Sequence, residues 1–197
     1  IMSRYTKIPA DTFKQLQINA GLILSDFTPE TGAFDAEDQI GATTGGITVA
    51  VTPTFSDFGD DVDNCPKNTK ELKRQDDVEV KVSGTYVTVT TTSAKALMAA
   101  ADIDKTDTTK VVPRRDLADT DFSDIWVVGD YSDKNGASNG GFIAIHLINA
   151  LSTGGFQLKT ADKSKGQMAF EYTAHYSISQ QDVVPYELYI KAGTAES

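Results

Sequence analysis

The chain has 197 residues, 40% of them hydrophobic, and a formal net charge of -10, which together fit one globular domain. The acid excess argues against wrapping nucleic acid or coating an anionic membrane, because both ligands are bound largely through Lys and Arg. A single cysteine, Cys65, excludes an internal disulfide and a Cys-rich zinc site. No segment has the apolar length of a membrane helix or a signal peptide, so we expect a soluble protein without a cleavable leader.

The acidic residues are 21 Asp and only 7 Glu, and Thr is abundant. Asp favours turns and loops, whereas Thr favours strands. The composition therefore predicts a mainly β domain with long acidic loops.

Two segments near the start of the chain show the period-two alternation of β-strands. Residues 16–24 alternate apolar side chains with Gln17 and Asn19, and residues 47–52 alternate Ile and Val with Thr. Pro53 cannot donate to a ladder, so we expect the second strand to end there.

The middle of the chain predicts another strand and one helix. Val residues alternate at 78–82 and again, in the opposite phase, at 87–89, and Gly84 lies at the switch. We expect a bulge or sharp bend at Gly84. Residues 93–101 predict a helix, with Ser93 as the N-cap and strong helix formers at nearly every position from 94 to 101.

The second half of the chain reads mainly as strands. Residues 125–128 are apolar on both faces, which favours a buried strand, and residues 142–151 fit a buried strand or a helix. Residues 167–178 alternate strictly, and 186–190 alternate after a polar turn. We predict that residues 165–191 form a C-terminal β-hairpin.

A short motif matches the nucleophile elbow of serine hydrolases. Ser138 lies between Gly136 and Gly140, and Asp162 and His175 follow in the order of that enzyme class. However, turn formers precede the motif, whereas an elbow needs a strand there and a helix after it. A plain turn explains the motif better, and hydrolase activity through Ser138 stays as an alternative.

An acidic cluster predicts a second alternative, a calcium-binding adhesion domain. Its carboxylates are Asp57, Asp60, Asp61 and Asp63, which supply the oxygen ligands that calcium prefers, although a solvated acidic loop explains them better. His146 and His175 are far apart in sequence and fit no metal motif. The sequence therefore gives no reason to expect an enzyme, a cofactor or a metal centre.

Several segments, taken in order, resemble the major tail protein, or tail tube protein, of long-tailed phages that infect Gram-positive bacteria. The resemblance covers nearly the whole chain, and its specificity lies in the order of the segments. They are Asp-Thr-Phe-Lys-Gln-Leu-Gln-Ile-Asn-Ala-Gly from Asp11, Thr-Gly-Gly-Ile-Thr from Thr44, Thr-Pro-Thr-Phe-Ser-Asp-Phe-Gly-Asp-Asp-Val-Asp from Thr52, Lys-Val-Ser-Gly-Thr from Lys81, Ser-Ala-Lys-Ala-Leu-Met-Ala-Ala-Ala-Asp-Ile from Ser93, and residues 165–191.

The resemblance implies a single domain over residues 1–197 with a β-sandwich or half-barrel, one short helix and long loops. It implies a structural virion protein without catalytic activity, made in the host cytoplasm and located in the tail. Six subunits would form a ring with a continuous inner β-barrel, and stacked rings would form a hollow tube for genome delivery. A tape-measure protein and tail-end proteins would be its partners, and DNA would pass without specific binding.

Within that picture, residues 1–15 form an N-terminal arm and residues 53–77 form a long loop between subunits. Phe55, Phe58, Asp60 and Asp61 are our candidates for subunit contacts, because aromatic residues in a polar segment are typical of interfaces. The alternative is that the two aromatic residues fold back on their own core. The tube lumen is expected to be acidic, although the sequence does not identify which carboxylates line it.

Overall fold

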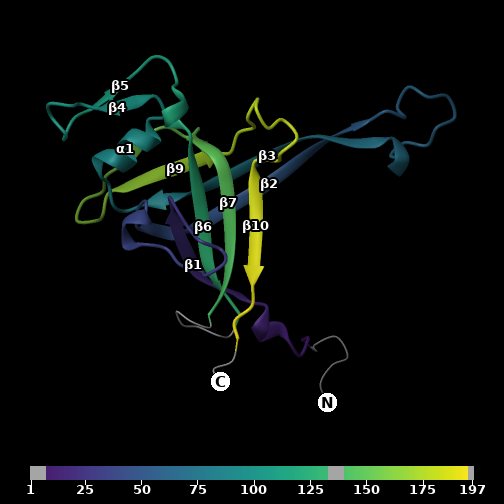
Figure 1. The fold of residues 1–197 in the computed structure, drawn as a ribbon, viewed down its shortest axis with the longest axis horizontal. Coiled ribbons are helices and arrows are strands. Elements are labelled where there is room, and N and C mark those ends of the chain that lie inside the picture. The colour runs from purple at the N-terminus through teal and green to yellow at the C-terminus, as the bar shows by residue number, and fades with distance from the viewer. Residues whose placement is uncertain (1–7, 133–139, 195–197) are drawn as a thin grey trace.

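The computed structural model describes residues 8–132 and 140–194, which form two layers of antiparallel strands (Figure 1). Sheet 1 has the order β1, β6, β7, β10, with the bounds β1 Gln17–Leu24, β6 Ser123–Tyr131, β7 Gly141–Ser152 and β10 Tyr186–Lys191. Sheet 2 is formed by β2 Thr43–Asp57, β3 Lys73–Tyr86, β8 Gln157–Lys159 and β9 Gln167–Thr173. The expected mainly β fold is confirmed.

The helix and a small hairpin lie together at one end of the sheets (Figure 1). The helix α1 Thr91–Leu97 leads into a two-stranded hairpin of β4 Ala101–Ile103 and β5 Val111–Pro113. The short 3-10 turns are Thr12–Lys14, Ala36–Asp38, Lys70–Leu72 and Asp119–Asp121.

The long strand β7 joins the two sheets. Phe142 to Leu147 pair with β10, whereas Leu151 and Ser152 pair with β9 in sheet 2. The strands of the two sheets consequently cross, with β6, β7 and β10 running down the view and β2, β3 and β9 across it (Figure 1).

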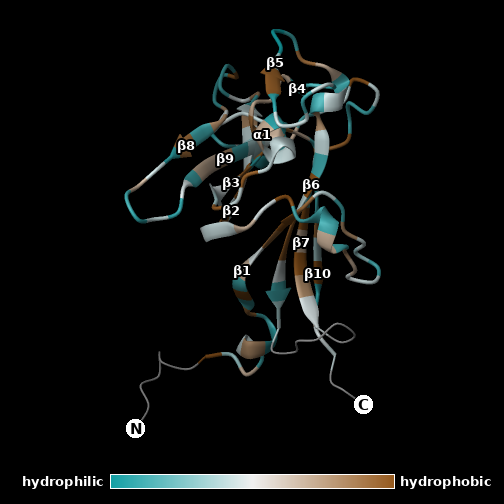
Figure 2. Ribbon diagram, turned by 90° about the vertical axis from the view of Figure 1, so that its left-hand side faces the viewer, coloured by the Kyte–Doolittle hydropathy of each residue, from teal (hydrophilic) through white to brown (hydrophobic). Residues whose placement is uncertain are grey.

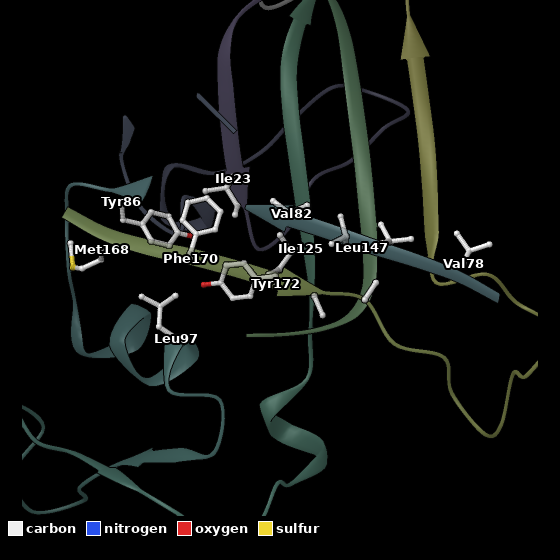
Figure 3. Packing of buried hydrophobic residues seen from close by; sticks show 13 residues of the cluster. Ile23, Val78, Val82, Tyr86, Leu97, Ile125, Leu147, Met168, Phe170 and Tyr172 are labelled. Carbon is white, nitrogen blue, oxygen red and sulfur yellow. The ribbon is translucent and has the colours of Figure 1, made fainter. Parts of the chain in front are cut away.

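The main core lies between the crossed sheets (Figure 3). Successive side chains of a strand point to opposite faces, so each strand contributes alternate residues. Each fully buried Val or Leu contributes about 1.5–3 kcal/mol relative to an exposed one. The buried members are Ile23, Val78, Val80, Val82, Tyr86, Leu97, Ile125, Leu147, Ala150, Met168, Phe170, Tyr172 and Ala174.

A second buried cluster covers the other face of sheet 1. Leu24, Trp126, Phe142 and Ala144 come from the sheet, and Phe27 comes from the loop that follows β1. Phe27 packs edge-on against the Phe142 ring, with centroids 5.2 Å apart. Sheet 1 is buried on both faces here, which explains why β6 and β7 have runs of consecutive apolar residues. β7 is largely brown, the hydrophobic colour, in Figure 2. Both segments are strands, which excludes the helical alternative for residues 142–151.

The expected long loop at residues 53–77 is largely a β-hairpin. β2 continues through Pro53 to Asp57, and β3 begins at Lys73, so only residues 58–72 connect the strands. The expectation that Pro53 ends β2 is wrong because β2 pairs with β3 alone among the described residues. A strand at the edge of a sheet tolerates a missing N–H on its open side.

The helix begins and ends earlier than residues 93–101. Thr90 is the N-cap: its hydroxyl accepts a hydrogen bond from the backbone N–H of Ser93 at 3.1 Å, and the Ser93 hydroxyl accepts one from the N–H of Thr90 at 2.8 Å. Ser93 is therefore the third residue of this capping box. The helix ends before Ala99, which adopts a left-handed conformation with φ 58°.

The expected C-terminal hairpin over residues 165–191 is wrong. β9 pairs with β3, β7 and β8, whereas β10 pairs with β7 in the other sheet. β9 also ends at Thr173, before the expected end at residue 178. Both strands have the expected alternation, but alternation does not identify a strand's partner, and here the connecting segment crosses between the sheets.

Gly84 is not the site of a bulge. β3 keeps a single phase from Val78 to Tyr86, and the register shift lies opposite, at Gly45 and Gly46 of β2, with φ 77° and 85°. A Cβ atom added at Gly84 would lie 2.6 Å from Cζ of Phe170. Glycine is needed there because the Phe170 ring occupies the space of its side chain.

Candidate functional site

The most prominent surface feature is the arm, which we define as residues 54–77 of the β2–β3 hairpin (Figure 1). Val78 is the last buried residue of β3 on this side, and from there to Lys73 the strand extends about 17 Å at about 3.4 Å per residue. Phe55 is 53% exposed, and Lys73 Nζ lies 5.7 Å from its ring centroid. The arm therefore carries apolar surface away from the core.

The connection at residues 58–72 is held by its own hydrogen bonds. The two carboxylate oxygens of Asp57 accept hydrogen bonds from the backbone N–H groups of Gly59 and Asn68, each at 2.9 Å. Gly59 is buried beneath Cys65 and Leu72. The tip is thus an ordered loop, and Asp57 is a structural residue in it.

The aromatic and acidic side chains that follow Asp57 face solvent. Phe58 is 60% exposed, Val62 is more than half exposed, and Asp60, Asp61 and Asp63 are exposed. The alternative that Phe55 and Phe58 fold back on their own core is therefore wrong. The four residues named as contact candidates lie together on the arm, where an apolar surface is next to negative charge.

The acidic side chains at residues 57–63 are not gathered around one point in the described structure. Among residues 8–132 and 140–194, no group of three or more His, Cys, Asp or Glu side chains is arranged to hold a metal ion. The calcium-binding alternative loses its geometric basis, since Asp57 binds backbone N–H groups and its acidic neighbours point outward.

Sheet 2 presents a polar outer face. Glu79, Lys81 and Glu171 lie there, on the side of β3 and β9 opposite the core, next to the Thr residues of β2. Lys81 Nζ lies 2.8 Å from Glu79 Oε1, and this hydrogen bond outweighs partial desolvation and raises the pKa of Lys81. The single helix packs on the other side of the sheet through Leu97, so nothing helical covers this face in the described part of the chain.

Both edges of sheet 2 are open in the described residues. β2, with 15 residues, pairs only with β3, and the short strand β8 pairs only with β9. Open edges carry unpaired N–H and C=O groups that can pair with another chain. A 15-residue strand is far longer than edge strands usually are, unless a partner covers them.

An apolar groove of about 300 Å³ separates β2 from sheet 1. Ile47, Val49 and Ile145 line it. The apolar surface continues onto β10, where Leu188 and Ile190 are 51% and 55% exposed. Ile47, Val49 and Ile145 are partly buried against the main core, so this lateral surface is a second apolar region that the described residues cover only in part.

The hydrolase alternative depends on Ser138, which lies outside the described residues. Of its expected partners, His175 is half-buried, with Nδ1 3.2 Å from the carbonyl oxygen of Asn149 and its ring edge-on to Phe122. Asp162 lies in the exposed turn between β8 and β9. The structure does not test the triad.

A polar cluster on sheet 1 was missed by the sequence reasoning. His146 stacks on Trp126 at 4.0 Å between ring centroids, and its two nitrogens face Asp124 at 3.1 Å and Glu187 at 3.4 Å. A hydrogen bond from Tyr189 at 2.6 Å lowers the pKa of Glu187. These residues come from three strands, so no sequence spacing links them.

Comparison with protein-family models found no match, and a search of curated proteins found no similar sequence. Among the described residues, no helix combines the length and the apolar character needed to cross a membrane. The functional argument therefore rests on the surfaces described above.

Proposed function

We propose that the chain is a structural subunit of a phage tail tube, one that assembles into hexameric rings and then into a hollow conduit for genome delivery. The observation that carries this proposal is that the subunit exposes both edges of sheet 2 and an ordered arm with two exposed aromatic residues. The open edges and the exposed aromatic residues would make a monomer prone to aggregate, because both promote association. In a symmetric assembly, both kinds of surface would instead form contacts between subunits.

In the proposed ring, the β2 edge of one subunit pairs with the β8 edge of the next. This contact joins different surfaces, so it closes into a ring when the rotation between subunits allows it. The lateral surface formed by Val49, Ile145, Leu188 and Ile190 lies beside β2 and supplies apolar area for the same contact. Because β8 has three residues and β2 has 15, this pairing covers part of the β2 edge.

In the proposed tube, the polar outer face of sheet 2 lines the lumen. Glu79 and Glu171 on this face, together with a net charge of -10, disfavour binding of DNA phosphates. Their repulsion reaches about one Debye length, roughly 8 Å at physiological salt. DNA can therefore pass without adhering to the wall.

The arm supplies the contact between rings. It projects along the strand direction of sheet 2, away from the core (Figure 1). It carries Phe55 and Phe58, which are both more than half exposed. Buried aromatic residues are frequent anchors of protein interfaces. The tape-measure and tail-end proteins implied by the resemblance would be the remaining partners.

Negative-stain microscopy of the purified protein tests this proposal. The wild-type protein should form rings and tubes, whereas a variant in which residues 58–72 are replaced by an Asn-Gly turn should form rings only. The two-residue turn is compatible with the hairpin, so the fold should survive. A wild-type protein that stays a monodisperse monomer at high concentration refutes the proposal.

A fluorophosphonate probe separates this proposal from the hydrolase alternative. The structural role predicts no labelling of Ser138, and the Ser138→Ala variant should assemble like the wild type. Labelling that disappears in the variant would instead identify a serine enzyme.

A further inference from the structure

The two ends of sheet 2 differ in charge and lie at opposite ends of the same strands. The arm tip follows β2 at one end. At the other end, the turn at residues 160–166 connects β8 to β9 and lies beside the start of β2 and the end of β3, because Tyr86 pairs with both Thr43 and Met168. Figure 2 shows this turn as a hydrophilic segment between β8 and β9, and Figure 1 shows the arm tip on the far side of the molecule.

An open groove of about 540 Å³ lies at the turn end. Lys163 and Lys165 line it together with Thr44 and Val87, and Lys159 lies at the adjacent end of β8. All three lysines are exposed, and none forms an ion pair with a carboxylate of the described residues. In a chain with a net charge of -10, this end is locally basic.

The arm tip is complementary to this groove in charge. Asp60, Asp61 and Asp63 are exposed, and none of them has an ion-pair partner in the described residues. Opposite charges on two surfaces select the partner and fix its orientation.

The two ends also match in apolar surface. At the tip, Phe58 and Val62 are more than half exposed, and at the turn end Leu158 and Val89 are more than half exposed. Each end therefore combines apolar side chains with an excess of one charge, because the tip stays acidic on balance despite Lys67 and Lys70, and the turn end stays basic on balance despite Asp162. Interfaces commonly bury apolar side chains at the centre and keep charges at the rim.

We propose that the acidic tip of one subunit's arm docks onto the lysine-lined turn end of sheet 2 in a second copy of the chain, with Asp60 and Asp61 facing Lys163 and Lys165. The inference rests on the proposed tube, and it names the receiving surface in the next ring. Because donor and receiver lie at opposite ends of one sheet, the contact is head-to-tail and repeats without closing. A tube built from this contact has two different ends, one with free arm tips and the other with free lysine-lined grooves.

Charge reversal tests the contact. The variant D60K/D61K presents a basic tip to a basic receiver, and K163E/K165E presents an acidic receiver to an acidic tip. Each variant alone should form rings but require at least a tenfold higher concentration to form tubes. Variant D116K/D182K, which reverses two exposed acidic residues outside both surfaces, is the matched control and should form tubes like the wild type.

Mixing the two variants gives the decisive result. Rings of D60K/D61K have a basic tip and a basic receiver, and rings of K163E/K165E have an acidic tip and an acidic receiver. An equimolar mixture should therefore recover tubes in which the two kinds of ring alternate. High salt should weaken both the wild-type and the mixed tubes, because it screens these exposed charges.

The outcomes separate this inference from the proposed function. Wild-type tubes together with unimpaired tubes of both variants overturn the docking surface and leave the tube standing. Loss of tubes in each variant without recovery in the mixture also overturns the pairing of these charges. A wild-type protein that forms neither rings nor tubes overturns both proposals.

Discussion

The substitution Gly84→Val examines a tight contact in the main core. The added Cβ would lie 2.6 Å from Cζ and 2.9 Å from Cε1 of Phe170, and the Phe170 ring is itself stacked on Tyr86 at 4.2 Å. Overpacking of this kind costs about 1–3 kcal/mol, and loss of the ring pair adds about 0.5–1.5 kcal/mol. The higher strand propensity of Val offsets at most about 1 kcal/mol of this destabilisation. We expect a net loss of about 2 kcal/mol in the free energy of unfolding.

Thermal unfolding followed by circular dichroism measures this loss as a fall in Tm of roughly 4–8 °C for a chain of this length. The matched control is Ser83→Val, one residue away on the outer face, where the same side chain meets no ring and should leave Tm nearly unchanged or raise it. Phe170→Leu in the Gly84→Val background should recover part of the loss, because the two sites are coupled. Equal Tm values for the variants at positions 83 and 84 would refute the reasoning.

Three further predictions concern the core, the lateral surface and a charged pair. Leu147→Ala should lower the free energy of unfolding by about 2–5 kcal/mol, measured by urea titration, because the side chain is fully buried. Leu188→Asp should change stability by less than about 0.5 kcal/mol yet abolish rings in size-exclusion chromatography, and rings that persist would contradict the lateral contact. Burial opposes ionisation of Asp121, but the Ala118 N–H and Arg114 outweigh it and lower the pKa of Asp121. Stability from this pair should therefore be complete above about pH 4 and lost as the pH falls further, and Arg114→Met should flatten that acid-induced loss in thermal unfolding.

The strands were the most predictable part of the fold. Alternation identified the buried faces of β3 and β9 because one face of each packs on the core and the other meets solvent. Alternation was less informative in β7. The loop containing Phe27 covers the second face of this strand, so apolar residues are found on both faces and the sequence does not alternate. Burial on both faces is decided by distant segments that a local pattern does not contain.

Strand partners and strand ends were not predictable from local pattern. β10 follows β9 in sequence but pairs with β7, because the bent β7 spans both sheets and offers it an edge. Pro53 predicted a strand end, yet β2 continues through it. On the open side of β2 there is no described strand whose hydrogen bonds the missing N–H could interrupt. Whether a strand lies at an edge depends on the whole sheet.

The candidate surfaces were predictable in part. Phe55 and Phe58 stood out as aromatic residues in a polar segment, and both are exposed on the arm. Their arrangement on an ordered hairpin was not foreseen, because the polar segment read as a loop. The lysine-lined groove was not foreseen either, since it combines the β8–β9 turn with the start of β2.

The mass and symmetry of the assembled protein test the central claim most directly. Each subunit has a mass of 21.2 kDa, so one ring should have six times that mass by native mass spectrometry. Class averages of end-on views should show sixfold symmetry around an open centre. A protein that remains at the mass of one subunit over the whole concentration range, or that forms only dimers, would contradict the account.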